Sequence, residues 1–401
     1  MTVDNLNLPH TINTFRLIIG YLKLQDTFSS SKTTVGVSNS KTRIFLCGPT
    51  VYDYCHIGHA RIFIIFDVLS RFLKSKNVKV RTVVNVTDID PKLYEGGDLG
   101  NCGSISKIYF DEFLKDLANL GINDSVIYCR TSDYIRIIIA LIKRLLHEKK
   151  AYSINGNIYL DVSKIRSFGQ LSHLKKEEMI EMRYDIDSNK RDPRDMILWN
   201  TADYYGLTYH DEMLGNGVPS FHIQDTAVAM NHFNGAYEIH GGGKDLVYPH
   251  HELQMALLQI LTKRKKSVSN WMHIGFVLVN GKKMSKSYKN TVYLRNLSKI
   301  YDVNALRIYL LSRHYHQSIE FKLKDLPKYQ KLNEILAGTL FNFRSSDQES
   351  GKDSRIVNQF KSYLADDLDT PNALELLMET AKNDNNKNDV RTMVEILGLR
   401  Y

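Results

Sequence analysis

The chain has 401 residues, more than a single hydrophobic core usually organises, and this length indicates roughly two to three domains. Lys and Arg exceed Asp and Glu, 53 against 44, a surplus that favours a polyanion such as a nucleic acid but is also common in other proteins. The four cysteines show no short-loop pairing, and no signal-peptide pattern or run of about twenty apolar residues occurs. We therefore expect a cytoplasmic protein that neither relies on disulfides nor enters a membrane.

The first expected structure is a strand–helix–strand unit. The polar stretch 29–34 predicts a surface turn, and the β-prone run 42–47 predicts the first core strand, ended by Gly48-Pro49. From Ala60 apolar residues recur at helical spacing, and a second strand is expected over 80–86. This order is typical of a parallel sheet with a right-handed crossover, in which ligands bind where a strand's carboxyl end turns into a helix.

A second, inserted region is expected between residues 100 and 200. There the helical stretch 135–147 is followed by strand-like pieces such as 157–162. The sheet should resume near Pro219, with strands at 221–223 and 238–240. 

The last part of the chain should be helical. Pro249 suits the first turn of a helix, and helices should run from Asp302 nearly to the end. The fold class is therefore α/β: a Rossmann-like, doubly wound parallel sheet with an inserted domain, followed by a C-terminal helical bundle. The expected ranges are 1–98 and 201–298 for the two halves of the Rossmann-like domain, 99–200 for the insertion and 299–401 for the bundle.

Two short motifs at opposite ends of the Rossmann-like domain point to ATP chemistry. His56-Ile57-Gly58-His59 offers two imidazoles around a residue without a side chain, and Lys283-Met284-Ser285-Lys286-Ser287 offers two ammonium groups. Donors already in place can stabilise the negative charge that spreads over a phosphate under in-line attack. Either string alone is a weak match, but their order and wide separation make coincidence improbable. Together they predict a nucleotide cradle.

This pair of motifs resembles the signature of class I aminoacyl-tRNA synthetases, and the surrounding stretches resemble the cysteinyl-tRNA synthetase family. The resemblance is dense from about residue 10 to residue 320 and looser beyond. The segments that carry it are 46–61, 85–90, 190–199, 240–252 and 365–371. Family members usually carry a further anticodon-reading domain where this chain ends, so the resemblance implies a short form with a reduced tRNA grip.

The resemblance implies a ligase that activates L-cysteine with ATP and Mg²⁺ and passes it to tRNA(Cys), as a monomer. His56 and His59 would hold the triphosphate and stabilise the reacting phosphate. Lys283 and Lys286 would neutralise the leaving pyrophosphate, with Gly58 and Ser287 also at the nucleotide.

The substrate pocket departs from the family. The resemblance implies a zinc ion bound by two Cys, one His and one Glu, and a zinc-bound thiolate would reject serine. The corresponding residues here are Cys47, Asp225, His250 and Gln254, so two of four ligands are changed. An aspartate can still bind zinc, whereas a neutral amide is a poor ligand. The pocket is expected to comprise Cys47, Thr87, Phe221, His222, Asp225, His240 and His250.

Two alternatives stay open for the pocket: a weakened zinc site, or a metal-free pocket that recognises cysteine by sulfur packing and the histidines. Two other functions are also compatible with the sequence. One is a ligase that joins cysteine to a small amine, as in mycothiol-pathway relatives, which the chain's C-terminal end favours. The other is a non-catalytic RNA-binding paralogue, which only the changed metal ligands support.

Overall fold

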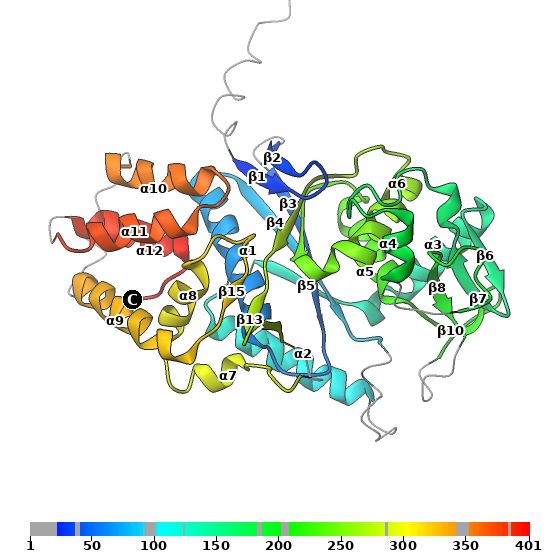
Figure 1. Cartoon of the computed structure of the whole chain (residues 1–401), viewed down its shortest axis with the longest axis horizontal. Coiled ribbons are helices and arrows are strands. Elements are labelled where there is room, and N and C mark those ends of the chain that lie inside the picture. Colours follow the sequence, from blue (N-terminus) through cyan, green and yellow to red (C-terminus); the bar gives the residue numbers. More distant parts are fainter. Residues whose placement is uncertain are drawn as a thin grey trace, which may run out of the picture.

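The computed structural model describes residues 22–36, 41–90, 93, 102–122, 125–182, 187–201, 208–284, 288–341, 353–383 and 386–401. A central parallel sheet lies between a bundle of helices at one end of the molecule and a second sheet at the other (Figure 1). None of the helices in these ranges combines the length and apolar character needed to cross a membrane.

The central sheet has the predicted doubly wound topology. Its five strands, all paired in parallel, lie in the order β12 (Val268–Ile274), β11 (Tyr237–Gly243), β3 (Lys41–Thr50), β4 (Lys79–Thr87) and β5 (Val126–Arg130). From β3 the chain first builds outward through β4 and β5, and later adds β11 and β12 on the other side. The strand order therefore reverses between β3 and β11, and ligands of such sheets bind at that point.

Alternation along β3 sends its side chains to two different cores. Ile44 and Leu46 belong to the large apolar cluster around α1 (Ile57–Ser75), whereas Phe45 and Cys47 belong to a separate cluster on the other face. That face is covered by α5 (Phe221–Phe233) and α6 (Glu252–Thr262), and Figure 1 shows α1 and α5 on opposite sides of β3 and β4. Cys47 consequently faces the helices that carry Asp225 and Gln254.

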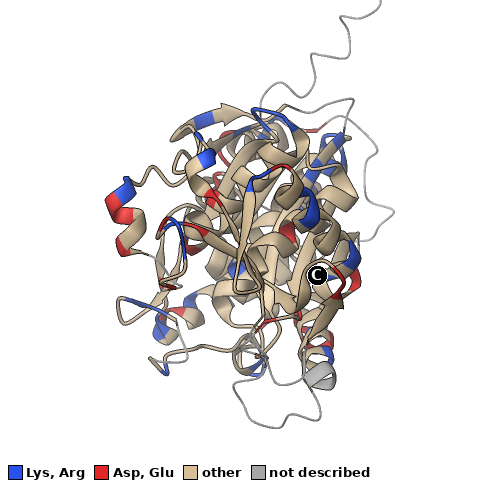
Figure 2. Cartoon of the chain, turned by 90° about the vertical axis from the view of Figure 1, so that its right-hand side faces the viewer, with Lys and Arg blue, Asp and Glu red and all other residues tan. Residues whose placement is uncertain are grey.

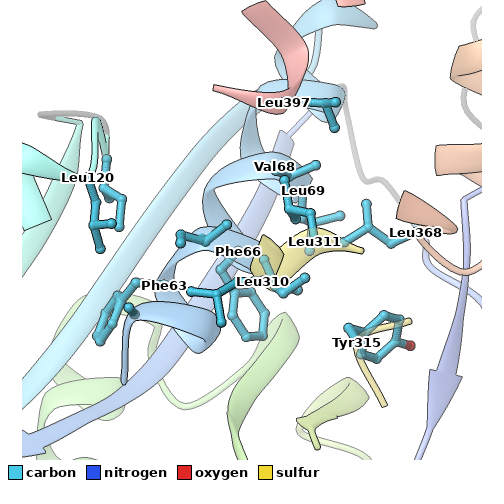
Figure 3. Packing of buried hydrophobic residues seen from close by; sticks show 14 of the residues in the cluster. Phe63, Phe66, Val68, Leu69, Leu120, Leu310, Leu311, Tyr315, Leu368 and Leu397 are labelled. Carbon is cyan, nitrogen blue, oxygen red and sulfur yellow. The ribbon is translucent and has the colours of Figure 1, made fainter. Parts of the chain in front are cut away.

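The helical bundle packs against α1 and thereby against the sheet. It consists of α8 (Val303–Leu311), α9 (Leu326–Leu340), α10 (Arg355–Ala365), α11 (Thr370–Thr380) and α12 (Lys387–Leu397). Val68 and Leu69 of α1 lie close to Leu311 of α8 (Figure 3), all of them buried. In the same interface the fully buried Arg307 donates to Asp67 Oδ2 at 2.7 Å. Apolar burial and this ion pair fix the bundle to the first helix.

The second sheet forms the other end of the molecule, together with α3 (Ile135–His147) and α4 (Lys176–Glu181). Its order is β6 (Ala151–Ile154), β7 (Asn157–Leu160), β8 (Met196–Asn200), β10 (Gly215–Pro219) and β9 (Tyr209–Asp211), paired antiparallel. Strand pairing does not follow the range 99–200, because β5 joins the central sheet whereas β9 and β10 join the second. The domain ranges themselves stay a prediction.

Three smaller units complete the described structure. A hairpin comprises β1 (Lys23–Asp26) and β2 (Ser31–Thr34), and a small sheet comprises β13 (Val277–Val279), β14 (Lys282–Lys283) and β15 (Ile319–Glu320). The helices α2 (Cys102–Asn119) and α7 (Leu294–Leu297) lie near the start of α1.

Several predictions of local structure were wrong. The expected strand at 221–223 is the first turn of α5, because burial of that segment against β3 and β4 outweighs the β propensity of Phe221 and Ile223. The expected turn at 29–34 is partly strand, since β2 pairs with β1. Strand β3 continues through Gly48-Pro49 to Thr50 with a shift of register. By contrast, the prediction for Pro249 is confirmed: it lies in the π-helical stretch Val247–His251, which leads directly into α6.

Candidate active site

His56 is the N-cap of α1, at the end of the short connection that follows the central strand β3 (Lys41–Thr50). Its Nδ1 accepts hydrogen bonds from the backbone N–H groups of Gly58, at 3.1 Å, and His59, at 3.2 Å. A neutral imidazole that accepts at Nδ1 carries its proton on Nε2. Burial lowers the pKa of His56 to about 4, so the ring is neutral near pH 7. The cap thus leaves Nε2–H as a donor at the positive end of a 19-residue helix.

Close packing around position 58 explains why a glycine stands there, a reason that the sequence did not reveal. A Cβ at this position would lie 2.9 Å from His56 Cε1 and 3.2 Å from Met284 Cε. The missing side chain therefore makes room for the capping imidazole and for a residue of the second ATP motif. The two motifs meet at this glycine.

His59 lies beside His56, and its environment also disfavours protonation. The two rings stack with centroids 3.6 Å apart. Burial lowers the pKa of His59 well below its usual range, and the neighbouring His56 and Lys283 lower it further. Its Nδ1 is buried and has no hydrogen-bond partner among the described residues. 

Lys283 extends from β14 toward the same region. Its Nζ donates to Asp245 Oδ2 at 2.5 Å, and both side chains are exposed, 53% and 38%. Strand β14 is held in place by β13, which pairs in turn with β15. Lys286 and Ser287 lie outside the described residues.

Cys47 is the centre of a buried polar cluster at the switch point between β3 and β11. Its Sγ lies 3.0 Å from Asp225 Oδ2, 3.1 Å from His251 Nε2, and 3.5 Å from Nε2 of both His240 and His250. Asp225 Oδ2 is also 2.5 Å from His250 Nε2. Burial, and secondly the charge of Asp225, raise the pKa of the Cys47 thiol well above its usual range. Without a cation nearby, the thiol stays neutral.

A surrounding layer of hydrogen bonds orients these side chains. Asn85 Nδ2 donates to Asp225 Oδ1 at 2.6 Å. The Nδ1 atoms of His222 and His250 lie 3.0 Å apart, and Tyr237 Oη lies 2.7 Å from His240 Nδ1. Burial lowers the pKa of His222 and of His240 well below the usual value, so neither ring contributes charge near pH 7.

The structure brings most of the predicted pocket residues together, but not all. Phe221, partly exposed, stacks on His250 with ring centroids 4.9 Å apart. Thr87 lies at the far end of β4, where it pairs with Thr50 rather than Cys47. Gln254 is fully buried; its Oε1 is 3.9 Å from Cys47 Sγ, and its Nε2 has no partner among the described residues.

The predicted pocket omitted two residues of the cluster, Asn85 and His251, although the sequence already groups His251 with His222, His240 and His250. Asn85 stands opposite Cys47 in the pairing of β3 with β4, and His251 places Nε2 against the Cys47 sulfur. The doubled histidine after Pro249 was the available signal for His251. Strand register, which the sequence does not state, was needed for Asn85.

The donor atoms at Cys47 suit a zinc ion. Thiolate, imidazole and carboxylate are the groups that bind zinc in proteins. Cys47, His250 and His251 each offer one donor atom within 4.8 Å of the other two, and all three residues are buried. Asp225 adds a carboxylate to the same cluster. The residues present therefore fit the metal that the family implies.

Two solved structures of aminoacyl-tRNA synthetases have the same fold as this chain. Methionyl-tRNA synthetase from Mycobacterium tuberculosis in complex with methionyl-adenylate has a TM-score of 0.61 at 14% identity, covering 89% of each chain. The leucyl-tRNA synthetase of Agrobacterium radiobacter K84, solved in a ternary complex, has a TM-score of 0.62 at 10% identity, covering 90% of this chain and 83% of that one. At such identity the likeness shows the fold alone, which is that of class I aminoacyl-tRNA synthetases.

Sequence comparison narrows this class to one family. Residues 33–331 match the family described as tRNA synthetases class I (C) catalytic domain. Cysteine–tRNA ligases of Thermoplasma acidophilum and Clostridioides difficile are 34% and 32% identical, covering 88% and 93% of this chain and 79% and 84% of theirs. The chain therefore belongs to the class I synthetase family of cysteine–tRNA ligases, as the motifs predicted.

Proposed function

We propose that this chain activates L-cysteine with ATP to cysteinyl-adenylate and transfers the cysteinyl group to tRNA(Cys). The observation that carries the proposal is the position of the Cys47 cluster at the switch point of the central sheet. A short connection after β3 then leads to the helix α1, which His56 caps. A thiol-recognising pocket and a phosphate-binding helix start thus lie at the two ends of one short segment.

On the ATP side, the residues supply positive charge and donors without changing protonation. Neutral His56 offers Nε2–H to a phosphate oxygen, and the N-terminus of α1 favours the same anion. Lys283 exchanges its exposed contact with Asp245 for the pyrophosphate that leaves. We assign Lys286, Ser287 and Mg²⁺ to the same phosphates by family membership. Such fixed donors lower the barrier by matching charge that develops in the transition state.

On the cysteine side, the pocket separates a thiol from a hydroxyl. Zinc, when bound, supplies a soft Lewis acid that prefers the substrate thiolate to the hydroxyl of serine. Cys47, Asp225 and His250 would hold the metal, and the exposed Phe221 stacks on His250. His222 orients His250 through the contact between their Nδ1 atoms.

The surplus of Lys and Arg over Asp and Glu attracts the tRNA phosphates in general, but it does not show where on the protein the tRNA binds. Figure 2 shows Lys and Arg interspersed with Asp and Glu on the side that it presents. We therefore place the tRNA acceptor end by the chemistry of the site, beside His56 and the Cys47 pocket, and not by a charged patch.

Two assays test the proposal. Cysteine-dependent exchange of pyrophosphate into ATP measures adenylate formation, and charging of total tRNA measures transfer. We expect both with cysteine and neither with serine. Exchange without tRNA charging would instead indicate transfer to a small amine, and absence of both would indicate the non-catalytic paralogue.

A further inference from the structure

Either His251 or Gln254 could supply the fourth ligand of the metal site, because both side chains lie near Cys47 Sγ. The sequence assigned it to Gln254, by correspondence with the family's glutamate. We propose that His251, rather than Gln254, completes the zinc-binding set with Cys47, Asp225 and His250. The identity of the metal as the zinc that selects cysteine rests on the proposed function, but the choice of ligands does not.

Cys47 Sγ already lies within 3.5 Å of the other three donor atoms, and the donor atoms of Cys47, His250 and His251 lie within 4.8 Å of one another. Cys47 Sγ lies 3.0 Å from Asp225 Oδ2, 3.1 Å from His251 Nε2 and 3.5 Å from His250 Nε2, and the His250–Asp225 contact is 2.5 Å. Neighbouring ligands of tetrahedral zinc are about 3.3–3.6 Å apart, given bonds of about 2.0–2.3 Å. These contacts therefore need to lengthen by less than about 1 Å around a cation. A metal bound here would take the place of the direct contact between His250 Nε2 and Asp225 Oδ2.

The second nitrogen of each imidazole is already engaged on the outside of the cluster. His251 Nδ1 lies 2.7 Å from His273 Nε2, and His273 Nδ1 lies 2.6 Å from Thr27 Oγ1. When His251 donates its Nδ1–H to His273, its Nε2 lone pair points at Cys47. Zinc-bound histidines typically make such an outward hydrogen bond, which fixes the tautomer and the ring orientation. His250 has the corresponding contact with His222.

Gln254 lacks the properties of the missing ligand. Its amide is neutral, and an amide oxygen is a poor substitute for a carboxylate on zinc. Its Oε1 is 3.9 Å from Cys47 Sγ, farther than any of the other three proposed donors. The charges also balance without it, because one thiolate and one carboxylate offset a divalent cation. Apart from this long contact of Oε1, no hydrogen bond among the described residues joins the amide to the cluster: its Nε2 is buried and has no partner there.

Cobalt substitution tests the assignment directly on the full-length protein. Metal-free protein is titrated with Co²⁺, and absorption reports the thiolate-to-cobalt charge transfer and the ligand field; competition with Zn²⁺ gives the zinc Kd. We expect His251→Gln to weaken zinc binding by about 100-fold or more and to change the ligand-field bands, since it removes a ligand. Gln254→Ala should change the Kd by less than about threefold and leave both bands unchanged.

Two further variants and one measurement make the result decisive. Cys47→Ser should abolish the charge-transfer band, and His273→Gln should weaken zinc binding by about 10–100-fold while keeping it. X-ray absorption on the zinc-loaded wild type should show two imidazoles, a count that requires no variant to fold. One imidazole, an unchanged Kd for His251→Gln, or a wild type that binds no zinc would overturn the proposal. None of these measurements uses ATP, cysteine or tRNA, so failure of the proposed function would be seen separately.

Discussion

The imidazole rings of His56 and His59 stack at the first turn of α1, with centroids 3.6 Å apart and planes inclined by 17°. This arrangement disfavours protonation of both imidazoles, because a proton on either ring would place a positive charge in a buried position against the neighbouring ring. Burial lowers the pKa of His56 to about 4, and the pKa of His59 well below its usual range. The ATP motif is therefore a pair of neutral donors at physiological pH.

This relationship predicts an acid-sensitive fold. The folded-state pKa of His56, about 4, lies below the ordinary value of 6.5, so the unfolded chain binds more protons between these two values. Stability is fully present above about pH 6.5 and falls as the pH falls toward 4, by on the order of 1–3 kcal/mol from this residue. Urea unfolding at pH 7.5, 6.0 and 4.5 should show a shallower loss for His56→Asn than for the wild type.

Asparagine is the informative replacement because it also caps helices well. At pH 7.5 His56→Asn should keep most of the stability, whereas His56→Ala should lose about 1 kcal/mol with the cap. An identical pH slope in wild type and His56→Asn would contradict the assignment of the acid sensitivity to this imidazole.

Gly58→Ala should disable adenylate formation although alanine is the better helix former. Its Cβ would stand 2.9 Å from His56 Cε1 and 3.2 Å from Met284 Cε, so the ring or the second ATP motif must move. A misplacement of about 1 Å can cost about 100-fold in rate. The matched control is Gly338→Ala on α9, where a Cβ meets nothing within 4 Å. That variant should keep full exchange activity and gain up to about 1 kcal/mol.

Lys283→Ala should lower pyrophosphate exchange by about 100–1000-fold, the usual loss for one transition-state donor. Its thermal melting should stay unchanged, because the ion pair with Asp245 is exposed and contributes little stability. Lys282→Ala is the control on the same strand β14, and its exchange rate should stay close to wild type. Equal losses in the two variants would indicate a general charge effect instead of a specific contact.

Asp67→Asn should destabilise the fold by about 3–5 kcal/mol in urea unfolding, since it leaves the charge of Arg307 buried without its carboxylate. Replacing both residues by apolar ones, Asp67→Leu with Arg307→Met, should recover part of that loss. Glu395→Gln, in an exposed pair with Arg391, should change stability by less than about 0.5 kcal/mol. A loss below about 1 kcal/mol for Asp67→Asn would mean that Arg307 finds sufficient compensation in the carbonyls of Leu120 and Leu397.

The sequence by itself determined the features that depend on residues close together along the chain. Hydrophobic periodicity located α1, α3 and the strands β3, β4 and β11, and the two ATP motifs with their flanking stretches determined the family. It also singled out Cys47, Asp225 and His250, which stand in family motifs and which the structure brings into one cluster; their role in substrate binding stays a prediction. These signals are contiguous in the chain, so no long-range information was needed to read them.

The tertiary structure alone decided which side chains meet. Local propensity favoured a strand at 221–223, but packing on β3 and β4 made it a helix, which presents Asp225 to Cys47. Strand register put Asn85, not Thr87, opposite Cys47, and the turn before α6 aimed His251 at its sulfur. Such contacts depend on register and side-chain direction between segments up to about two hundred residues apart, which periodicity along the chain does not encode.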